Sequence, residues 1–320
     1  MKDLKIVFMG TPDFAVTTLA TIVEAQYNVV GVITAPDRPA GRGRKLNTSA
    51  VKKYALEKNL KIMQPTNLKD TAFLEELKAL HANLQIVVAF RMLPKVVWQM
   101  PKYGTFNLHA SLLPQYRGAA PINWALINGE TKTGVTTFFI DDKIDTGEVI
   151  LQEETPISIE DTAGSLHDKL MNLGAELVLK TIHAIKNDKV ILTKQNDSKE
   201  LKSAYKIHKE TCKVNWELPL ENIYNHIRGL CPYPAAWTTL YNKEEEEEEE
   251  EVFLKIYAIS KIEEVHNYKN GTLLFTKKEI KIAVNQGYIN LLEIQLPGKL
   301  KMKTNEVLNG LNLSKNAYVA

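Results

Sequence analysis

The stretch "KIVFMGTPDF", residues 5–14, decides the fold class of the chain. Its first half, Lys5–Met9, is a short, mostly apolar run of the kind that forms a strand buried on both faces of a sheet. Gly10 and Pro12 end the run, and a helical pattern follows over about residues 14–25. A buried strand, a loop and a helix in this order predict a parallel sheet whose connections are helices.

The same alternation continues through the first half of the chain. Further strands are predicted at residues 29–33, 61–63, 84–90, 105–109 and 134–140, and further helices at 49–58, 71–80 and 161–186. We therefore expect an α/β fold with a Rossmann-like, mostly parallel sheet and helices on both faces. Ligands bind beside the carboxyl ends of the strands in such sheets, so polar residues there are candidates for chemistry.

The second half of the chain has a different pattern. Its strand-like segments are short and closely spaced, at residues 213–216, 237–241, 252–259, 271–275, 280–284 and 287–293, with a helical segment at 220–228. This spacing predicts a smaller, OB-like β-barrel. A polar segment separates the two patterns, so we expect a first domain over 1–187, a linker over 188–203 and a β-barrel domain over 204–320.

The composition is that of an ordinary globular protein, with 44% hydrophobic and 24% charged residues. No stretch is apolar enough to predict a secretory signal or a membrane span. The two cysteines, Cys212 and Cys231, are too few for a disulfide framework, so we expect a reducing compartment, the cytoplasm. No Cys or His cluster has metal-ligand spacing, so we expect no metal. We also expect the protein to be a monomer.

The net charge of +2 conceals a contrast along the chain. Eight consecutive glutamates, Glu244–Glu251, lie between two predicted strands of the second domain. The rest of the chain is therefore clearly basic, which fits a polyanionic partner. The run itself predicts a solvated loop that does not face nucleic acid, because phosphates would repel it.

Two hydrogen-bonding side chains lie at the end of the predicted strand over 105–109. Asn107 and His109 are two residues apart, so they project from the same face of the strand. A His takes up and releases protons near neutral pH, and an Asn amide can donate to a developing oxyanion, so the pair suits a tetrahedral intermediate. An acid that orients the His is available in Asp141, Asp142 or Asp145, and the residue pattern does not choose between them.

The pattern disfavours covalent catalysis. No Gly-x-Ser-x-Gly elbow is present, and neither cysteine lies in a recognisable nucleophile context. Direct attack by a nucleophilic group of the substrate is the simpler chemistry. A purely structural role for His109, with its ring hydrogen bonds satisfied, remains an alternative.

Two short motifs resemble one enzyme family, the formyltransferases that use 10-formyltetrahydrofolate. "NLHASLLP", residues 107–114, is similar to the Asn-x-His motif of that family, and Asp145–Gly147 is similar to its later Asp-x-Gly motif. The resemblance implies that Asn107, His109 and Asp145 are catalytic. It also implies a folate site formed by Phe90, Ser111, Leu112, Leu113 and Pro114.

Longer segments resemble one branch of the family, the methionyl-tRNA formyltransferases. They are "FMGTPDF" at 8–14, "PDRPAGRGRKL" at 36–46, and the segments around Lys206–Glu210 and Pro232–Pro234. The likeness covers nearly the whole chain. It implies that the amino group of methionine on initiator methionyl-tRNA directly attacks the formyl carbon of 10-formyltetrahydrofolate.

The loop over residues 34–46 has a physical interpretation of its own. It combines glycines and one acid, Asp37, with four basic residues: Arg38, Arg42, Arg44 and Lys45. Arginines on such a loop can reach phosphates and stack on bases, although a merely solvated loop is the alternative. In the resembled enzymes this loop enters the acceptor arm of tRNA, with Arg42 at the matching position. Backbone contacts to the same RNA are expected from Lys206, Lys209 and Arg228 of the barrel.

The sequence departs from the family pattern at two places, and three rival functions share some of its features. Phe90-Arg91 stands where many relatives have a Tyr-Gly-type turn, and the glutamate run lies outside the family pattern. A formyltransferase for a small nucleotide or amino-sugar amine is the nearest rival, and the basic loop argues against it. A nicotinamide-dependent oxidoreductase would have a Gly-x-Gly-x-x-Gly turn after the first strand. A non-catalytic RNA-binding module would leave the Asn-x-His pair unexplained.

Overall fold

The computed structural model describes residues 1–40, 45–196, 200–242 and 250–320, and it divides the chain into two compact units. Unit 1 comprises Met1–Gly118, Lys132–Pro156 and His167–Ser203, and unit 2 comprises Ala119–Thr131, Ile157–Leu166 and Ala204–Ala320. The division differs from the expected domain limits, because two segments that lie within residues 1–187 belong to unit 2. Within the described ranges, no helix has the length and apolar character needed to cross a membrane.

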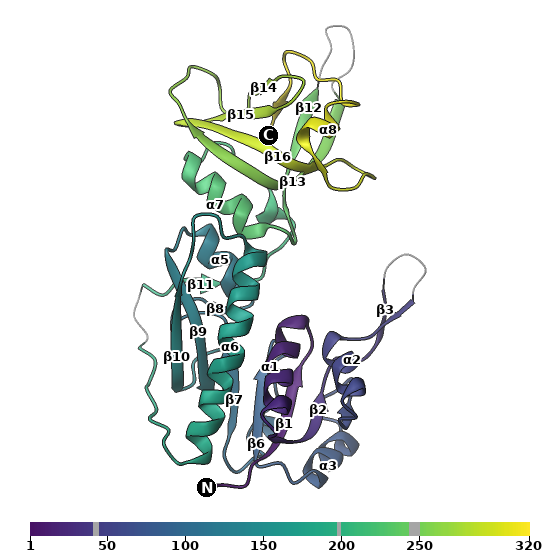
Figure 1. The fold of residues 1–320 in the computed structure, drawn as a ribbon, viewed down its shortest axis with the longest axis vertical. Helices are drawn as coiled ribbons and strands as arrows, with labels where there is room; N and C mark the ends of the chain where they lie inside the picture. The colour runs from purple at the N-terminus through teal and green to yellow at the C-terminus, as the bar shows by residue number, and fades with distance from the viewer. Residues whose placement is uncertain (41–44, 197–199, 243–249) are drawn as a thin grey trace. The chain divides into compact units, whose positions relative to one another are not determined.

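Unit 1 is built on a seven-stranded sheet with the strand order β10-β9-β7-β6-β1-β2-β5 (Figure 1). The strands are β1 (Lys5–Gly10), β2 (Asn28–Ile33), β5 (Ile62–Met63), β6 (Leu84–Val88), β7 (Thr105–His109), β9 (Lys132–Phe139) and β10 (Val149–Pro156). The five strands from β5 to β7 are parallel, whereas β9 and β10 are antiparallel to their neighbours. The predicted mostly parallel α/β fold is confirmed.

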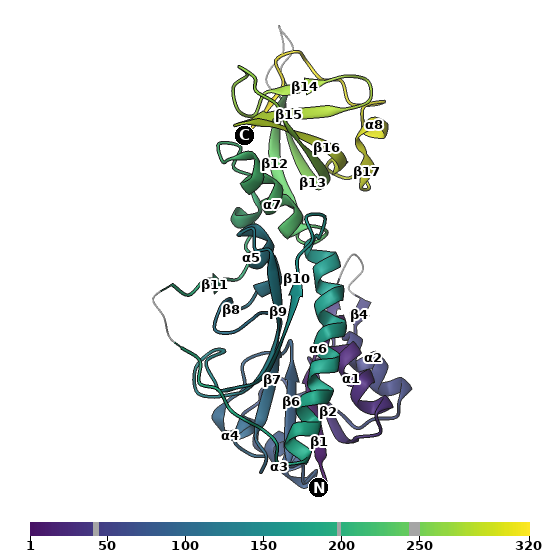
Figure 2. The same ribbon diagram turned by 60° about the vertical axis from the view of Figure 1, so that its left-hand side comes forward.

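Helices cover both faces of this sheet (Figures 1 and 2). On one face, strand side chains form a core cluster with α3 (Thr71–Ala79) and α4 (Lys95–Trp98). Its buried members include Val7, Met9, Ile33, Phe73, Leu77 and Val97. The helices α1 (Asp13–Glu24) and α6 (Ala163–Lys186) lie on the other face.

The path of α6 fixes the direction of the side chains of β7. A Cβ atom on Gly174 of α6 would lie 2.8 Å from the Leu108 side chain, so glycine allows the helix to approach this strand closely. Leu108 therefore points toward α6. Because side chains alternate along a strand, Asn107 and His109 point to the opposite face, the one that carries α3 and α4.

Some local elements follow directly from the sequence, whereas others, including a hairpin within the 34–46 loop and β10, were not predicted. The helix α2 (Ala50–Glu57) begins where the Ser49 hydroxyl accepts a hydrogen bond from the Lys52 backbone N–H at 3.0 Å. The predicted loop over 34–46 contains a short hairpin of β3 (Arg38–Ala40) and β4 (Lys45–Asn47). The edge strand β10 was not predicted, because only one of its faces is buried and polar residues alternate along it.

Unit 2 is a barrel-like antiparallel sheet with the strand order β14-β15-β16-β13-β12-β18, with β17 paired to β16 (Figure 2). The strands are β12 (Ala236–Asn242), β13 (Glu250–Glu263), β14 (Leu273–Phe275), β15 (Ile280–Val284), β16 (Gly287–Gln295), β17 (Met302–Lys303) and β18 (Tyr318–Val319). A bridge between Thr272 and Tyr318 brings the two ends of the sheet together. The predicted β-barrel is therefore confirmed.

Two helices pack together in unit 2. They are α5 (Pro121–Ile127) and α7 (Leu220–Leu230), and the Asn123 side chain donates to the Gly229 carbonyl oxygen at 2.8 Å. The predicted strand over 213–216 is reduced to a single bridge, in which Lys213 pairs with Trp237 and the Val214 N–H donates to the Trp237 carbonyl oxygen at 2.9 Å. A short 3-10 helix, Glu210–Cys212, precedes this segment, and its apolar residues Val214 and Trp216 lie in the barrel core.

Candidate active site

His109 ends the buried strand β7, and its side chain is only 8% exposed. Its Nε2–H donates to the backbone carbonyl oxygen of Tyr116 at 2.8 Å. A carbonyl can only accept, so this bond leaves Nδ1 as the ring nitrogen that can take up a proton. Nδ1 lies 3.8 Å from Oδ2 of Asp145, a distance suited to an ion pair when the ring is protonated.

Asn107 lies two residues before His109 in β7, so the two side chains project from the same face of the strand. Its side-chain oxygen Oδ1 is buried and has no hydrogen-bond partner among the residues that the structure describes. Most buried polar atoms in native proteins are hydrogen-bonded, so an unpaired amide oxygen beside a candidate catalytic His indicates an acceptor that a donor group of a ligand would complete.

Asp145 is the acid that lies beside His109. Its Oδ2 also accepts a hydrogen bond from the Gly118 backbone N–H at 2.9 Å. The other two candidates are engaged elsewhere: Asp141 accepts from Thr146 at 2.8 Å, and Asp142 pairs with Lys95 at 3.4 Å. Tertiary structure thus makes the choice that the residue pattern left open.

The backbone at Asp145 is held in a conformation that few residues adopt. Asp145 has φ +56°, in the left-handed region, which Asp tolerates better than most residues. Two positions later, a Cβ on Gly147 would lie only 1.6 Å from the Phe139 carbonyl oxygen, so no other residue fits without a backbone shift. The turn over 145–147 is therefore a sterically demanding one that needs support from its surroundings.

Gln195 supplies that support, and the sequence did not indicate it. Its Nε2 donates to the carbonyl oxygens of Asp145 at 2.9 Å and Gly147 at 2.8 Å. Its Oε1 accepts from the Arg117 guanidinium at 2.8 and 3.0 Å. Gln195 lies in the segment predicted as a linker, where a polar residue carries no sign of a site. One side chain therefore ties the Asp145 turn to the segment that follows His109.

The residues of the expected folate site have unequal exposure. Ser111 and Leu113 are buried, and Ser111 donates to the Gln115 carbonyl oxygen at 2.7 Å. Phe90, Leu112 and Pro114 are half-buried. Gln152 of β10 donates to the Leu113 carbonyl oxygen at 2.7 Å, which holds this loop in place. The first two residues thus shape the loop, and the other three keep part of their surface exposed.

The basic loop is anchored at its base. Asp37 accepts hydrogen bonds from the Lys52 ammonium at 2.5 Å and from Gln64 at 3.0 Å. These two bonds, the Lys52 bond first, hold the pKa of Asp37 below its usual value. Arg38 is exposed on β3. Arg42 and Arg44 lie outside the described residues, and only the backbone of Lys45 is described, in β4.

The three basic residues expected on the barrel fall into two groups. Lys206 and Lys209 are exposed, and the Lys209 ammonium lies 5.6 Å from the Trp237 ring centre. Arg228 is buried, with 7% of its surface exposed, and donates to the carbonyl oxygens of Ser158 and Asp161 at 3.0 Å each. This placement disagrees with the expectation that Arg228 contacts RNA, because its donors are engaged inside unit 2.

Comparisons with known proteins agree with this architecture. The formyl transferase family model matches residues 4–182, and the model of the formyl transferase C-terminal domain matches residues 206–312. The chain is 61% identical to the methionyl-tRNA formyltransferase of Flavobacterium johnsoniae over 100% of both chains. It is 56% identical to that of Bacteroides thetaiotaomicron, over 98% of this chain and 97% of the relative.

A solved structure shows the same fold at greater distance. The N-formyltransferase from Helicobacter canadensis, in complex with folinic acid and dTDP-3-aminofucose, has a TM-score of 0.64 and 23% identity. The match covers 90% of this chain and 98% of that one. At this identity the likeness concerns the fold alone, whereas the relatives above match in sequence throughout. The chain belongs to the formyl transferase family, and within it to the methionyl-tRNA formyltransferases.

Proposed function

We propose that this protein transfers a formyl group from 10-formyltetrahydrofolate to the free amino group of methionine on initiator methionyl-tRNA. The observation that supports this most is the arrangement at the end of β7. There a buried His109 faces Asp145, and Asn107 carries an orphaned amide oxygen. Full-length similarity to methionyl-tRNA formyltransferases supports tRNA as the acceptor rather than a small nucleotide. A tRNA acceptor also fits a cytoplasmic enzyme.

Each side chain has one role in the proposed reaction. The Nδ2 group of Asn107 donates to the formyl oxygen as negative charge develops on it, while its Oδ1 can only accept a hydrogen bond. Nδ1 of His109 takes the proton that the attacking amine loses and returns it to the departing folate nitrogen. Asp145 stabilises the imidazolium that forms between these two transfers. One C–N bond forms, another breaks, and no redox partner is needed.

Two separate sets of residues are proposed to bind the two substrates. Phe90, Leu112 and Pro114 present surface to the folate, while Ser111 and Leu113 hold their loop. The methionine-bearing end of the tRNA is proposed to be guided by the basic residues of the 34–46 loop, Arg42 among them, and by Lys206 and Lys209. These RNA contacts increase the affinity for the tRNA but take no part in the formyl transfer.

A competition between acceptors tests the proposal. The purified protein is mixed with 10-formyltetrahydrofolate, methionine-charged initiator tRNA, glycinamide ribonucleotide and an amino-sugar nucleotide, and the formylated product is identified. We expect formyl-methionine on the tRNA. Formyl groups on a small nucleotide would keep the catalytic group and refute the tRNA acceptor. No transfer to any acceptor would refute the enzyme function.

A further inference from the structure

Arg91 lies at the same edge of the sheet as His109. The parallel strands β5, β6 and β7 end at Met63, Val88 and His109, so the segments that follow them lie along one edge. Arg91 comes directly after Phe90, a residue of the expected folate site. Many relatives have a Tyr-Gly-type turn here, so a cation at this position is a departure from the family pattern that the proposed reaction does not explain.

The guanidinium group of Arg91 is anchored but not neutralised. Its Nη1 donates to the Thr66 carbonyl oxygen at 2.8 Å, and its Nη2 donates to the Pro65 carbonyl oxygen. Both acceptors are uncharged, and among the described residues no carboxylate forms an ion pair with Arg91. A guanidinium carries more N–H groups than these two bonds use, so donors remain for a ligand.

A second arginine, Arg38, adds positive charge beside Arg91. Gln64 donates to Asp37, the neighbour of Arg38, at 3.0 Å, so the segment over 64–66 joins the base of the β3–β4 hairpin to Arg91. Partial burial, and then the charge of Arg38, lower the pKa of Arg91 from its usual value. Arg91 stays protonated all the same, because an arginine is not deprotonated in proteins.

The acidic side chains near the two arginines are engaged elsewhere. Asp37 pairs with Lys52 at 2.5 Å, and Asp142 pairs with Lys95 at 3.4 Å. Asp70 caps α3 by accepting a backbone hydrogen bond at 3.1 Å. The arginines therefore form a cationic pair without an anion of its own in the described part of the chain, and such a pair favours an anionic ligand.

We infer that Arg91, with Arg38 beside it, binds the glutamyl carboxylates of the formyl donor and thereby selects folates that carry glutamate. A guanidinium holds a carboxylate through two parallel hydrogen bonds, a geometry that a lysine does not provide. In 10-formyltetrahydrofolate an aminobenzoyl ring separates the formyl-bearing nitrogen from these carboxylates. With the nitrogen at His109 and the ring beside Phe90, the carboxylates extend toward Arg91.

A phosphate of the tRNA is the other anion that the reaction brings to this edge, and the neighbouring aromatic ring favours the folate. Cζ of Arg91 lies 5.7 Å from the Phe90 ring centre, so a ligand that packs on this ring has its next polar group beside the guanidinium. The inference deepens the proposed function and rests on it for the identity of the donor.

Calorimetric titration of the full chain with two matched ligands tests the inference. The probes are folinic acid and its diamide, in which neutral amides replace both glutamyl carboxylates. We expect the wild type to bind folinic acid roughly tenfold more tightly, because the diamide cannot form charge-assisted hydrogen bonds as an anion. The preference should shrink at high salt, because Arg91 is exposed. Equal affinities of the wild type for the two ligands would overturn the inference.

Two substitutions separate the charge of Arg91 from its support of the loop. Arg91→Gln keeps an N–H donor for the carbonyl oxygens of Pro65 and Thr66 but removes the charge, so it should bind the two ligands equally. Arg91→Lys keeps the charge without the fork of donors, so about a threefold preference should remain. An Arg91→Gln variant with the full preference would refute the inference.

The matched control is Lys78→Gln, which removes an exposed charge from the last turn of α3. That turn leads into the start of β6, at the opposite edge of the sheet from Arg91. The control should therefore keep the wild-type preference. Thermal unfolding checks the fold of each variant, and Arg91→Lys keeps the test valid if Arg91→Gln is unstable.

Binding of methionine-charged initiator tRNA and formyl transfer are measured on the same proteins. A weaker affinity of Arg91→Gln for the tRNA, with an unchanged preference between the two folates, would make Arg91 an RNA contact and overturn the inference. If binding of folinic acid depends on Arg91 but no formyl group reaches the tRNA, the inference stands and the proposed acceptor is wrong. If the wild type binds neither folate, the proposed donor is wrong and the inference fails with it.

Discussion

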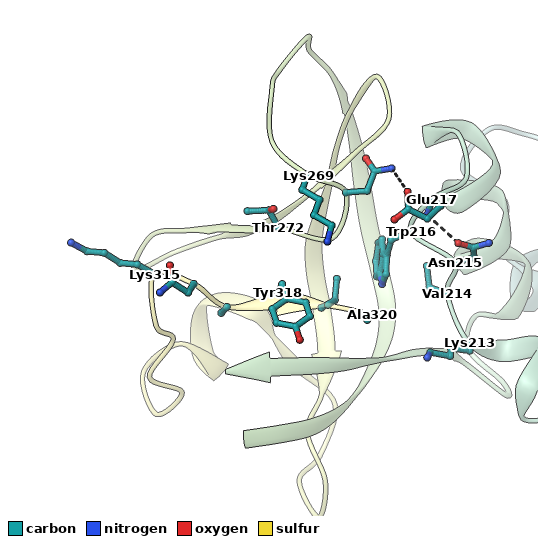
Figure 3. Close-up of a pocket in the computed structure, with 14 residues that line it drawn as sticks. Lys213, Val214, Asn215, Trp216, Glu217, Lys269, Thr272, Lys315, Tyr318 and Ala320 are labelled. Carbon is teal, nitrogen blue, oxygen red and sulfur yellow. Dashed lines mark hydrogen bonds between the residues drawn. The ribbon is translucent and has the colours of Figure 1, made fainter. Parts of the chain in front are cut away.

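The end of β7 in unit 1 differs from the pocket in unit 2 that is lined by residues 213–217, 269–272 and 315–320 (Figure 3). The two regions differ in the burial and in the hydrogen-bond partners of their basic side chains. His109 is buried, one ring nitrogen is bonded to a carbonyl oxygen, and the other faces Asp145. Lys269 is exposed and has no acidic partner among the described residues. The first arrangement fixes the position of one ring nitrogen, and the second leaves an exposed charge without a fixed partner.

This difference shows what each region requires of the chain. A proton transfer depends on geometry to within fractions of an ångström, so the groups involved must be held in place. Burial and hydrogen bonds such as those from Gln195 to the Asp145 turn can do this. Electrostatic attraction of a polyanion depends mainly on charge and distance, so exposed lysines are sufficient. The effects of substitutions in the two regions should therefore differ in size and in the kinetic constant that changes.

The largest effect is expected for His109→Ala. Loss of the general acid–base should lower kcat by at least about a hundredfold with the fold intact. Steady-state formyl transfer and circular dichroism measure the two quantities. His167→Ala, which removes a more exposed imidazole of the same unit, is the control and should keep its rate. A His109 variant with most of its activity would remove this residue from the mechanism.

Gln195→Glu tests whether the position of the Asp145 turn matters for activity. The substitution keeps the size of the side chain and an oxygen for Arg117, but it places a carboxylate oxygen against the carbonyl oxygens of Asp145 and Gly147. We expect kcat to fall by roughly ten- to a hundredfold with little change in KM for the tRNA, because the Asp145 turn shifts relative to His109. An unchanged kcat, or a change confined to KM, would show that the turn does not depend on Gln195.

Arg228→Met tests whether a cation of unit 2 can be structural. Removing the guanidinium leaves the carbonyl oxygens of Ser158 and Asp161 without their donor, so unfolding should require about 1–3 kcal/mol less free energy. Urea denaturation measures this. The matched variant Lys209→Met, at an exposed position, should leave stability nearly unchanged and raise KM for the tRNA a few-fold. The opposite pattern would restore Arg228 as an RNA contact.

The smallest effect is expected for Asp37→Asn. The pKa of Asp37 is lowered in the folded protein, so the carboxylate contributes stability above its unfolded pKa, which is about 3.9. That contribution is lost as the pH falls through the folded pKa. The variant should therefore be slightly less stable than the wild type at pH 7, and the difference should vanish at strongly acidic pH. A difference that is the same at both pH values would argue against this ion pair.

The sequence predicted those features that depend on neighbouring residues. Apolar runs followed by helical periodicity predicted the parallel sheet, and short spaced strands predicted the barrel. The two-residue spacing of Asn107 and His109 placed both on one face, as the structure shows. Only a single bridge at Lys213 remains of the strand predicted at 213–216, because alternating Val214 and Trp216 are equally compatible with a segment that fills a core.

What only the tertiary structure decided is which distant side chains meet. The residue pattern left three candidate acids open and the family resemblance pointed to Asp145, but only the fold shows that Asp145 lies 3.8 Å from His109. Gln195 reaches Asp145 across 50 positions and Arg117 across 78, and Arg228 reaches Ser158 across 70. The physical reason is that periodicity is a local property of the backbone. Contacts between distant residues depend instead on the path of the whole chain, which no single segment specifies.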